Sequence, residues 1–139
     1  GQHLLRAHGE PAMKRLWIAV GLLAALAGLA WLHVAQLSSL TEELIDLQSQ
    51  VDDALEQEDW ARADAAAAEI EQRWERKAFY LHITLRHEDI DAIRSSIREM
   101  RAYLACRDDA AECLAVGARL VNQLELLLEE ELPTLKNVL

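Results

Sequence analysis

Potential metal ligands gather in one short stretch of this sequence, between positions 82 and 91. They are His82, His87, Glu88, Asp89 and Asp91. Metal ligands on a single helix need partners at positions i and i+4 and a fixed fold around them, and the His-Glu-x-x-His spacing is absent. We therefore expect no metal here, and we expect His87 to cap the start of a helix.

The other common catalytic signatures are also absent from the sequence. It contains no Gly-rich phosphate loop, no Gly-x-Ser-x-Gly nucleophile elbow and no paired-carboxylate signature. Ser38, Ser39, Ser95 and Ser96 fall on polar helix faces, and the acidic residues between 52 and 59 lack the glycine turn of a calcium loop. We expect a protein that is not an enzyme and that holds no cofactor.

The two cysteines, Cys106 and Cys113, offer one further chemistry. They bracket a polar stretch that predicts a turn between antiparallel helices, where two Cα atoms could approach the roughly 4.4 to 6.8 Å separation of a disulfide. We favour a disulfide, which would also fit a location outside the cytoplasm. The alternative is two free, mostly buried thiols, because Cys113 adjoins the apolar stripe residue Leu114.

An apolar stretch, Leu16–Ala35, must organise the rest of the chain, because its twenty residues include no Asp, Glu, Lys or Arg. At 1.5 Å per residue a helix of this length reaches roughly 30 Å, the thickness of the hydrocarbon core of a bilayer. The stretch predicts a transmembrane anchor at 13–36, in contact with lipid over residues 16–35. Trp17 and Trp31 are spaced so that each indole could lie near one membrane interface.

The charges on either side of the anchor predict its orientation. Lys14 and Arg15 precede the apolar stretch Leu16–Ala35, whereas Glu42 and Glu43 are the first charges after it, and an excess of Lys and Arg marks the cytoplasmic side. We expect a single-pass protein of the cell membrane, with a cytoplasmic N-terminus and an extracytoplasmic C-terminal domain. A signal peptide cleaved near 28–30 is the alternative, but the apolar run continues past that point and favours an uncleaved anchor.

Two further features belong to the N-terminal part of the chain. Gly21, Ala24, Ala25 and Gly28 form small-residue steps in the anchor that could seat a second transmembrane helix. Residues 1–12 show no dependable helical periodicity, so we expect a disordered N-terminal tail, upstream read-through or residues introduced by cloning.

Charge divides the chain into two unequal parts. Residues 1–35 carry a net charge of +2, whereas residues 36–139 carry −12. An acidic exterior neither releases counterions from phosphates nor adheres to anionic lipid. We therefore expect no nucleic-acid partner and an outer part, 37–139, that forms one small domain standing off the membrane surface.

Beyond the anchor, apolar residues recur at alternating intervals of three and four, which is the pattern of a helix with one buried stripe. Such runs span residues 37–55, 60–74, 90–104 and 110–128. They predict an all-α fold in which a transmembrane helix continues into a stalk helix, followed by an antiparallel helical bundle, with about four helices in total.

The ends of these helices have their own signals. Asp59 and either Asp108 or Asp109 are expected as N-caps. Over residues 79–85 we favour a continuation of the second helix, and a short extended segment is the alternative, because periodicity over seven residues fits both. We expect Pro133 to stop the last helix, and the residues that follow it to fold back over one end of the bundle.

Eight apolar residues of these runs are expected to face one core. They are Trp60, Ile70, Trp74, Ile90, Ile93, Ile97, Val121 and Leu124. The alternative is a groove for a partner, because Trp supplies a large contact area and the Ala run at 65–68 lets another helix approach closely. A core is the favoured interpretation for an apolar stripe with this spacing.

Several of these features occur together in one known family. An N-terminal anchor is followed by an Asp59-Trp60 pair that opens an Ala-rich helix, by Trp74, by the His87-Glu88-Asp89-Ile90 sequence and by an Asn-Val-Leu ending. With them the chain resembles, over residues 13–139, a family of small single-pass bacterial membrane proteins of unknown function that is common in endospore-forming Gram-positive bacteria. The resemblance implies an N-terminal anchor and an extracytoplasmic helical domain, and it implies no catalytic residues.

These observations favour a membrane-anchored interaction or assembly module, which would bind another membrane protein or a second copy of itself. The alternative is a sensor, a helical bundle that holds a small ligand or a metal in an interior cavity lined by polar groups such as His82 and His87. A hydrolase or transferase would need a constellation of residues that the sequence lacks.

Overall fold

The computed structural model describes the backbone of residues 2–138 and the side chains of residues 11–83 and 85–132. The chain folds into four helices, which are α1 (Gln2–Glu56), α2 (Trp60–Thr84), α3 (His87–Cys106) and α4 (Ala110–Val138). No strand occurs among the residues described. The predicted all-α class is therefore confirmed.

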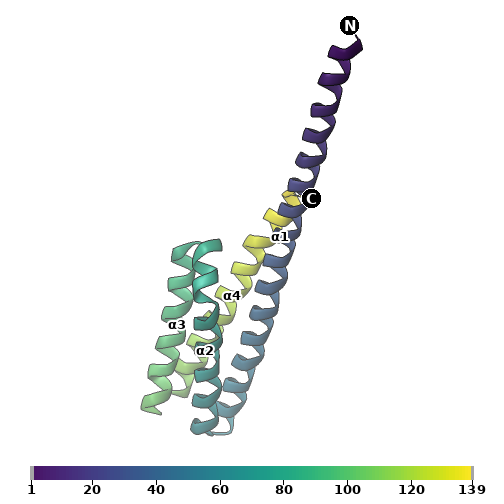
Figure 1. The fold of residues 1–139 in the computed structure, drawn as a ribbon. Coiled ribbons are helices and arrows are strands. Elements are labelled where there is room, and N and C mark those ends of the chain that lie inside the picture. The colour runs from purple at the N-terminus through teal and green to yellow at the C-terminus, as the bar shows by residue number, and fades with distance from the viewer. Residues whose placement is uncertain (1, 139) are drawn as a thin grey trace.

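The helices form an antiparallel bundle in which each helix packs against two others (Figure 1). In the described part of the chain, α2 and α4 both contact α1 and α3, whereas the diagonal pairs do not meet. The α2–α3 connection lies at the end of the bundle from which α1 projects, and the other two connections lie at the opposite end (Figure 1).

Over its described side chains, the single helix α1 is exposed in its N-terminal part and packed into the bundle in its C-terminal part. Between Met13 and Leu32 its large apolar side chains are 50–70% exposed. From Val34 onward, side chains on one face of α1 are buried against α2 and α4. We call residues 13–32 the projecting segment. The predicted stalk is thus not separate from the bundle, because residues 34–56 of the same helix form one of its four members.

The two ends of the chain differ from the predictions. α1 already begins at Gln2 and contains Pro11, where we expected no regular helix and a disordered tail, upstream read-through or residues introduced by cloning. α4 runs through Pro133 to Val138, where we expected a stop and a folded-back end. α1 continues beyond α2 and therefore gives the last turns of α4 a neighbour. The contact between His33 of α1 and Glu131 of α4, at 3.4 Å, shows that the two helices still pack together two residues before Pro133.

Side-chain caps define two of the helix starts as predicted. Asp59 Oδ1 accepts a hydrogen bond from the Arg62 backbone N–H at 3.2 Å, and Asp109 Oδ1 accepts one from the Glu112 backbone N–H at 3.1 Å. The helix α3 starts differently, because its N-cap is Arg86, whose side chain makes no capping bond. The predicted capping role of His87 is therefore wrong.

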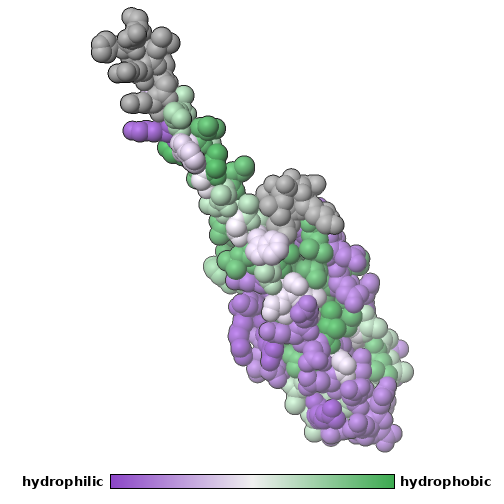
Figure 2. All heavy atoms as spheres, turned by 90° about the vertical axis from the view of Figure 1, so that its right-hand side faces the viewer, coloured by the Kyte–Doolittle hydropathy of each residue, from purple (hydrophilic) through white to green (hydrophobic). Residues whose placement is uncertain are grey.

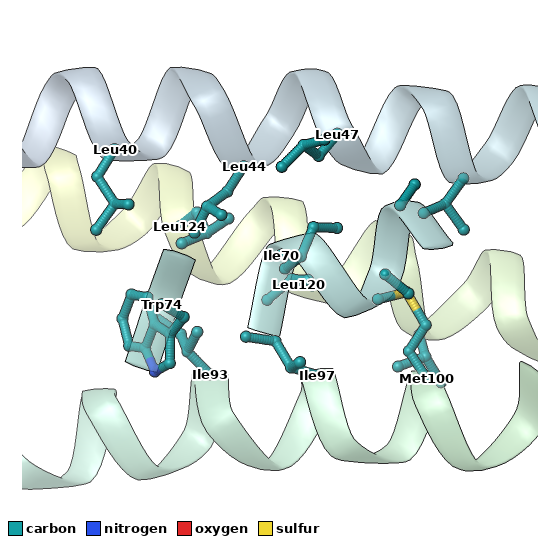
Figure 3. Packing of buried hydrophobic residues seen from close by; sticks show 14 of the residues in the cluster. Leu40, Leu44, Leu47, Ile70, Trp74, Ile93, Ile97, Met100, Leu120 and Leu124 are labelled. Atoms are coloured by element: carbon teal, nitrogen blue, oxygen red, sulfur yellow. The ribbon is translucent and has the colours of Figure 1, made fainter. Parts of the chain in front are cut away.

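The core lies along the bundle axis, with side chains from all four helices (Figure 3). Six of the eight residues predicted for it are at most 1% exposed, namely Ile70, Trp74, Ile90, Ile93, Ile97 and Leu124. Side chains this deeply buried cannot line a partner groove, so the core interpretation holds for them.

Trp60 and Val121 are corrections to the predicted core, because both are only partly buried. Trp60 is the first residue of α2, at the open end of the bundle. Val121 lies beside the buried stripe of α4, which passes through Leu120 instead. Leucines and valines flank this stripe on both sides, so periodicity alone could not centre it.

A few polar side chains also lie inside the bundle. Thr41, Gln48 and Ser96 are 1–2% exposed. Ser96 Oγ donates a hydrogen bond to Gln123 Oε1 at 2.7 Å and accepts one from Arg119 Nε at 3.3 Å. Ser96 therefore joins α3 to α4 and does not lie on a polar outer face as predicted.

Candidate interaction surface

His33 marks the point at which α1 leaves the bundle. Its Nδ1 is hydrogen-bonded to the Tyr80 hydroxyl of α2 at 3.0 Å, and its Nε2 lies 3.4 Å from Glu131 Oε2 of α4. One side chain of α1 thus contacts both neighbouring helices at the same level along the bundle. We call these three residues the junction.

An apolar groove between α1 and α4 adjoins the junction. It is lined by Trp31, Val34, Ala35, Ser38, Leu128 and Leu132. Ser38 is the only polar residue in this lining. Trp31 lies at the end of the groove nearest the projecting segment and is 62% exposed. The groove therefore extends the apolar surface of the projecting segment onto the bundle, and we call it the junction groove.

The projecting segment contains no charged residue from Leu16 to Leu32, and Lys14 and Arg15 lie at its far end. Figure 2 shows hydrophobic residues over this part of α1 and mainly hydrophilic ones over the bundle. Trp17 is 70% exposed, and a Cβ at Gly21 or Gly28 would meet nothing within 4 Å. By length and composition, α1 is the one helix in the described chain that could span a membrane.

The histidines predicted to line a cavity in a sensor lie on the surface instead. The Nδ1 atoms of His82 and His87 are 3.1 Å apart across the α2–α3 connection, and His87 Nε2 lies 3.7 Å from Asp91 Oδ2. The side chain of His87 is 75% exposed. Over the residues described, no three His, Cys, Asp or Glu side chains are grouped so that they could hold a metal.

The predicted disulfide between Cys106 and Cys113 is not formed in the structure, in which both are free thiols. Cys113 belongs to the buried stripe of α4, whereas Cys106 is exposed at the last turn of α3. The two side chains therefore face different environments. Burial, and to a smaller extent the charge of Asp109, raises the pKa of the Cys113 thiol.

Sequence reasoning missed the junction. His33 is the only strongly polar residue within the predicted span, and this signal could have identified it. Tyr80 and Glu131 carry no such local signal, because their role depends on the packing of α2 and α4 against α1.

These features define a class of protein, a four-helix bundle with one long apolar helix projecting from its end. The chain belongs to the family described as a domain of unknown function, DUF4363, whose model matches residues 31–138. The match starts next to the junction and covers the whole bundle. No curated protein and no solved structure is detectably similar to the chain.

Proposed function

We propose that this protein is a single-pass membrane protein whose bundle is a non-enzymatic interaction or assembly module for another membrane protein. In this proposal the projecting segment is the anchor. Lys14 and Arg15 lie on its cytoplasmic side, and the bundle lies outside the cytoplasm.

The exposed apolar surface of the projecting segment carries this proposal. Soluble proteins rarely leave so large an apolar area uncovered, and such areas mark membrane or partner contacts. Here the exposure extends around the whole helix, because Trp17, Leu22 and Leu23, which point in different directions, are each above 60% exposed. Contact on every side suits lipid better than it suits a single packed protein.

The junction groove supports a protein partner. A transmembrane helix that lies against the projecting segment could continue into this groove without crossing polar surface. Gly21 and Gly28 leave room for its close approach within the membrane. Ser38 offers a hydroxyl for a hydrogen bond at the groove. The groove could therefore recognise a polar group of the partner as well as cover its apolar surface.

Anchoring is tested with charges in the middle of the projecting segment. The double variant Leu22→Lys/Leu23→Lys should be released from membranes by alkaline carbonate, because each central lysine costs roughly 2.5 to 3.5 kcal/mol in a bilayer. The matched control, Gln36→Lys/Ser39→Lys, adds the same charges to exposed positions of the bundle and should stay with the membrane. Release of the native chain by carbonate would contradict the proposal.

Orientation is tested by adding protease to intact cells. Residues 36–139 should be digested from the outside, whereas a tag before Lys14 should be protected. Protection of the bundle together with digestion of the tag would reverse the proposed orientation.

Partner binding is tested with a photo-crosslinking amino acid. Placed at Ser38, in the junction groove, it should yield one discrete crosslinked membrane protein in the cells that make this chain. Placed at Ser95, an exposed position of α3, it should not. Identical products from the two positions, or lipid adducts alone from Ser38, would argue against the groove as a partner site.

A further inference from the structure

The last turns of α2 expose two large apolar side chains on the bundle. Phe79 is 81% exposed and Ile83 is 72% exposed, the highest values among the large hydrophobic residues described. They are four residues apart on one helix and therefore lie on the same face. They contribute little to the core, which α2 reaches through Ala78 and Leu81 instead.

The junction sets the level of these two side chains relative to the projecting segment. The hydrogen bond between Tyr80 and His33 shows that these two residues lie at the same height along the bundle axis. From Tyr80, α2 continues to Thr84, which is roughly 6 Å at 1.5 Å per residue. Because α1 and α2 are antiparallel, this stretch rises beside the apolar residues that precede His33. Ile83, three residues beyond Tyr80, thus reaches the level of the bundle-side end of the projecting segment, near Trp31.

Basic residues lie close to this apolar face along the chain. The stretch from Arg76 to His87 contains no Asp or Glu, although residues 36–139 carry a net charge of −12. Arg76, Lys77 and Arg86 are all exposed. The nearest acidic residue of α2, Glu75, is paired with Arg94 of α3 at 2.9 Å. The other acidic residues at this end of the bundle lie on α3 and α4 and comprise Glu88, Asp89, Asp91, Glu129, Glu130 and Glu131. The apolar and basic edge is therefore confined to α2 and the start of the α2–α3 connection.

We propose that this edge of α2 lies in the interfacial layer of the same bilayer that α1 spans. Phe79 and Ile83 would insert between lipids, and Arg76, Lys77 and Arg86 would bind the phosphates of anionic phospholipids. The proposal rests on the proposed anchoring by α1. It replaces the expectation that the domain stands off the membrane, because the acidic average hides a local edge of opposite charge.

Such docking would fix the bundle against the membrane at a second point. A single helix leaves a bundle free to rotate about the helix axis, whereas contact along α2 restricts that rotation. The junction groove lies between α1 and α4 and would then open toward one fixed direction in the membrane plane.

Spin labels on the full chain test the docking. The chain, with Cys106→Ser to remove the exposed thiol, is placed in nanodiscs of phosphatidylcholine and phosphatidylglycerol. Labels are attached to Ile83→Cys, to Leu22→Cys in the anchor and to Ala65→Cys, an exposed position near the other end of α2. The collision rate of each label with oxygen measures its exposure to lipid, and the collision rate with a water-soluble nickel complex measures its exposure to solvent.

We expect labels at positions 22 and 83 to favour oxygen, and the label at position 65 to favour nickel. If position 83 behaves like position 65 while position 22 stays in lipid, the docking is wrong and the anchoring stands. If position 22 also favours nickel, the proposed anchoring itself fails. Spin–spin broadening between labels at position 83 would show contact between two copies and would overturn lipid as the occupant.

A second measurement separates the basic residues from the apolar ones. The double variant Lys77→Glu/Arg86→Glu should shift the label at position 83 toward nickel, as should nanodiscs made of phosphatidylcholine alone. Arg98→Glu, at an exposed position of α3, should leave that label in lipid. An unchanged label in the double variant would overturn the assignment of anionic headgroups.

Discussion

Gln48 of α1 lies directly against Gly117 of α4, so closely that a Cβ at position 117 would overlap the side-chain amide of Gln48. Gln48 is 1% exposed and donates a hydrogen bond from Nε2 to Asp52 Oδ1 at 3.1 Å. The glycine thus leaves space for a buried polar side chain between two packed helices.

Enlarging Gly117 should therefore destabilise the bundle. Gly117→Leu should lower the free energy of unfolding by about 1 to 3 kcal/mol, the usual cost of overpacking. Thermal unfolding followed by circular dichroism in detergent measures the change. Ala118→Leu, at the exposed neighbouring position, is the control and should leave the melting temperature nearly unchanged.

The cause can be separated by a double variant. If the clash with Gln48 is responsible, Gln48→Ala/Gly117→Leu should lose less stability than the sum of the two single variants. Additive losses would mean that position 117 acts on some other contact.

The two tryptophans of the bundle should differ strongly in their contribution to stability. Trp74 is fully buried, so Trp74→Ala should cost about 3 to 5 kcal/mol and unfold most of the chain. Trp60 is only partly buried, and Trp60→Ala should cost far less. Equal losses in denaturant titrations would refute this difference.

A third substitution examines the indole nitrogen. Trp74 Nε1 is buried without a hydrogen-bond partner among the described residues. Replacing it with phenylalanine leaves no partner unsatisfied, so Trp74→Phe should cost clearly less than Trp74→Ala. The same denaturant titrations compare the two variants.

The cysteines should react one at a time. Cys106 is exposed, whereas Cys113 is buried and its thiol has a raised pKa, which disfavours the reactive thiolate. Iodoacetamide without reductant should add one group to the folded chain and two after denaturation, as counted by mass spectrometry. A denatured chain that takes up no alkyl group would indicate a disulfide and would restore the original prediction.

Asp52 should make stability depend on pH. Burial raises its pKa above the ordinary value of 3.8, and the charges of Asp53 and Glu56 add to this, whereas the hydrogen bond from Gln48 lowers it. The folded chain therefore holds this proton more tightly than the unfolded chain does. The contribution is favourable below the unfolded pKa and is lost as the pH rises through the folded value.

Asp52→Asn should consequently raise the melting temperature at neutral pH, and the gain should shrink below about pH 4, where the native carboxyl is protonated. Glu42→Gln makes the same change of charge at an exposed position of α1 and serves as the control. A gain that is equal at both pH values, or equal in the control, would assign the effect to net charge instead.

The sequence by itself determined the helical class, the apolar segment and six of the eight core positions. Each of these depends on local spacing: a period of three and four marks a buried stripe, and an uncharged run of twenty residues marks a possible span. Ile70, Trp74 and Ile93 could therefore be assigned to the core before any packing was known.

The tertiary structure decided the features that depend on how helices are rotated and paired. In α4, apolar residues lie on both sides of the buried stripe, so only packing selects Leu120 over Val121 and buries Cys113 while Cys106 stays exposed. The contact of His33 with Tyr80 spans 47 residues of sequence. No local pattern encodes such a contact, because it arises only when α1 and α2 are placed side by side at a particular level.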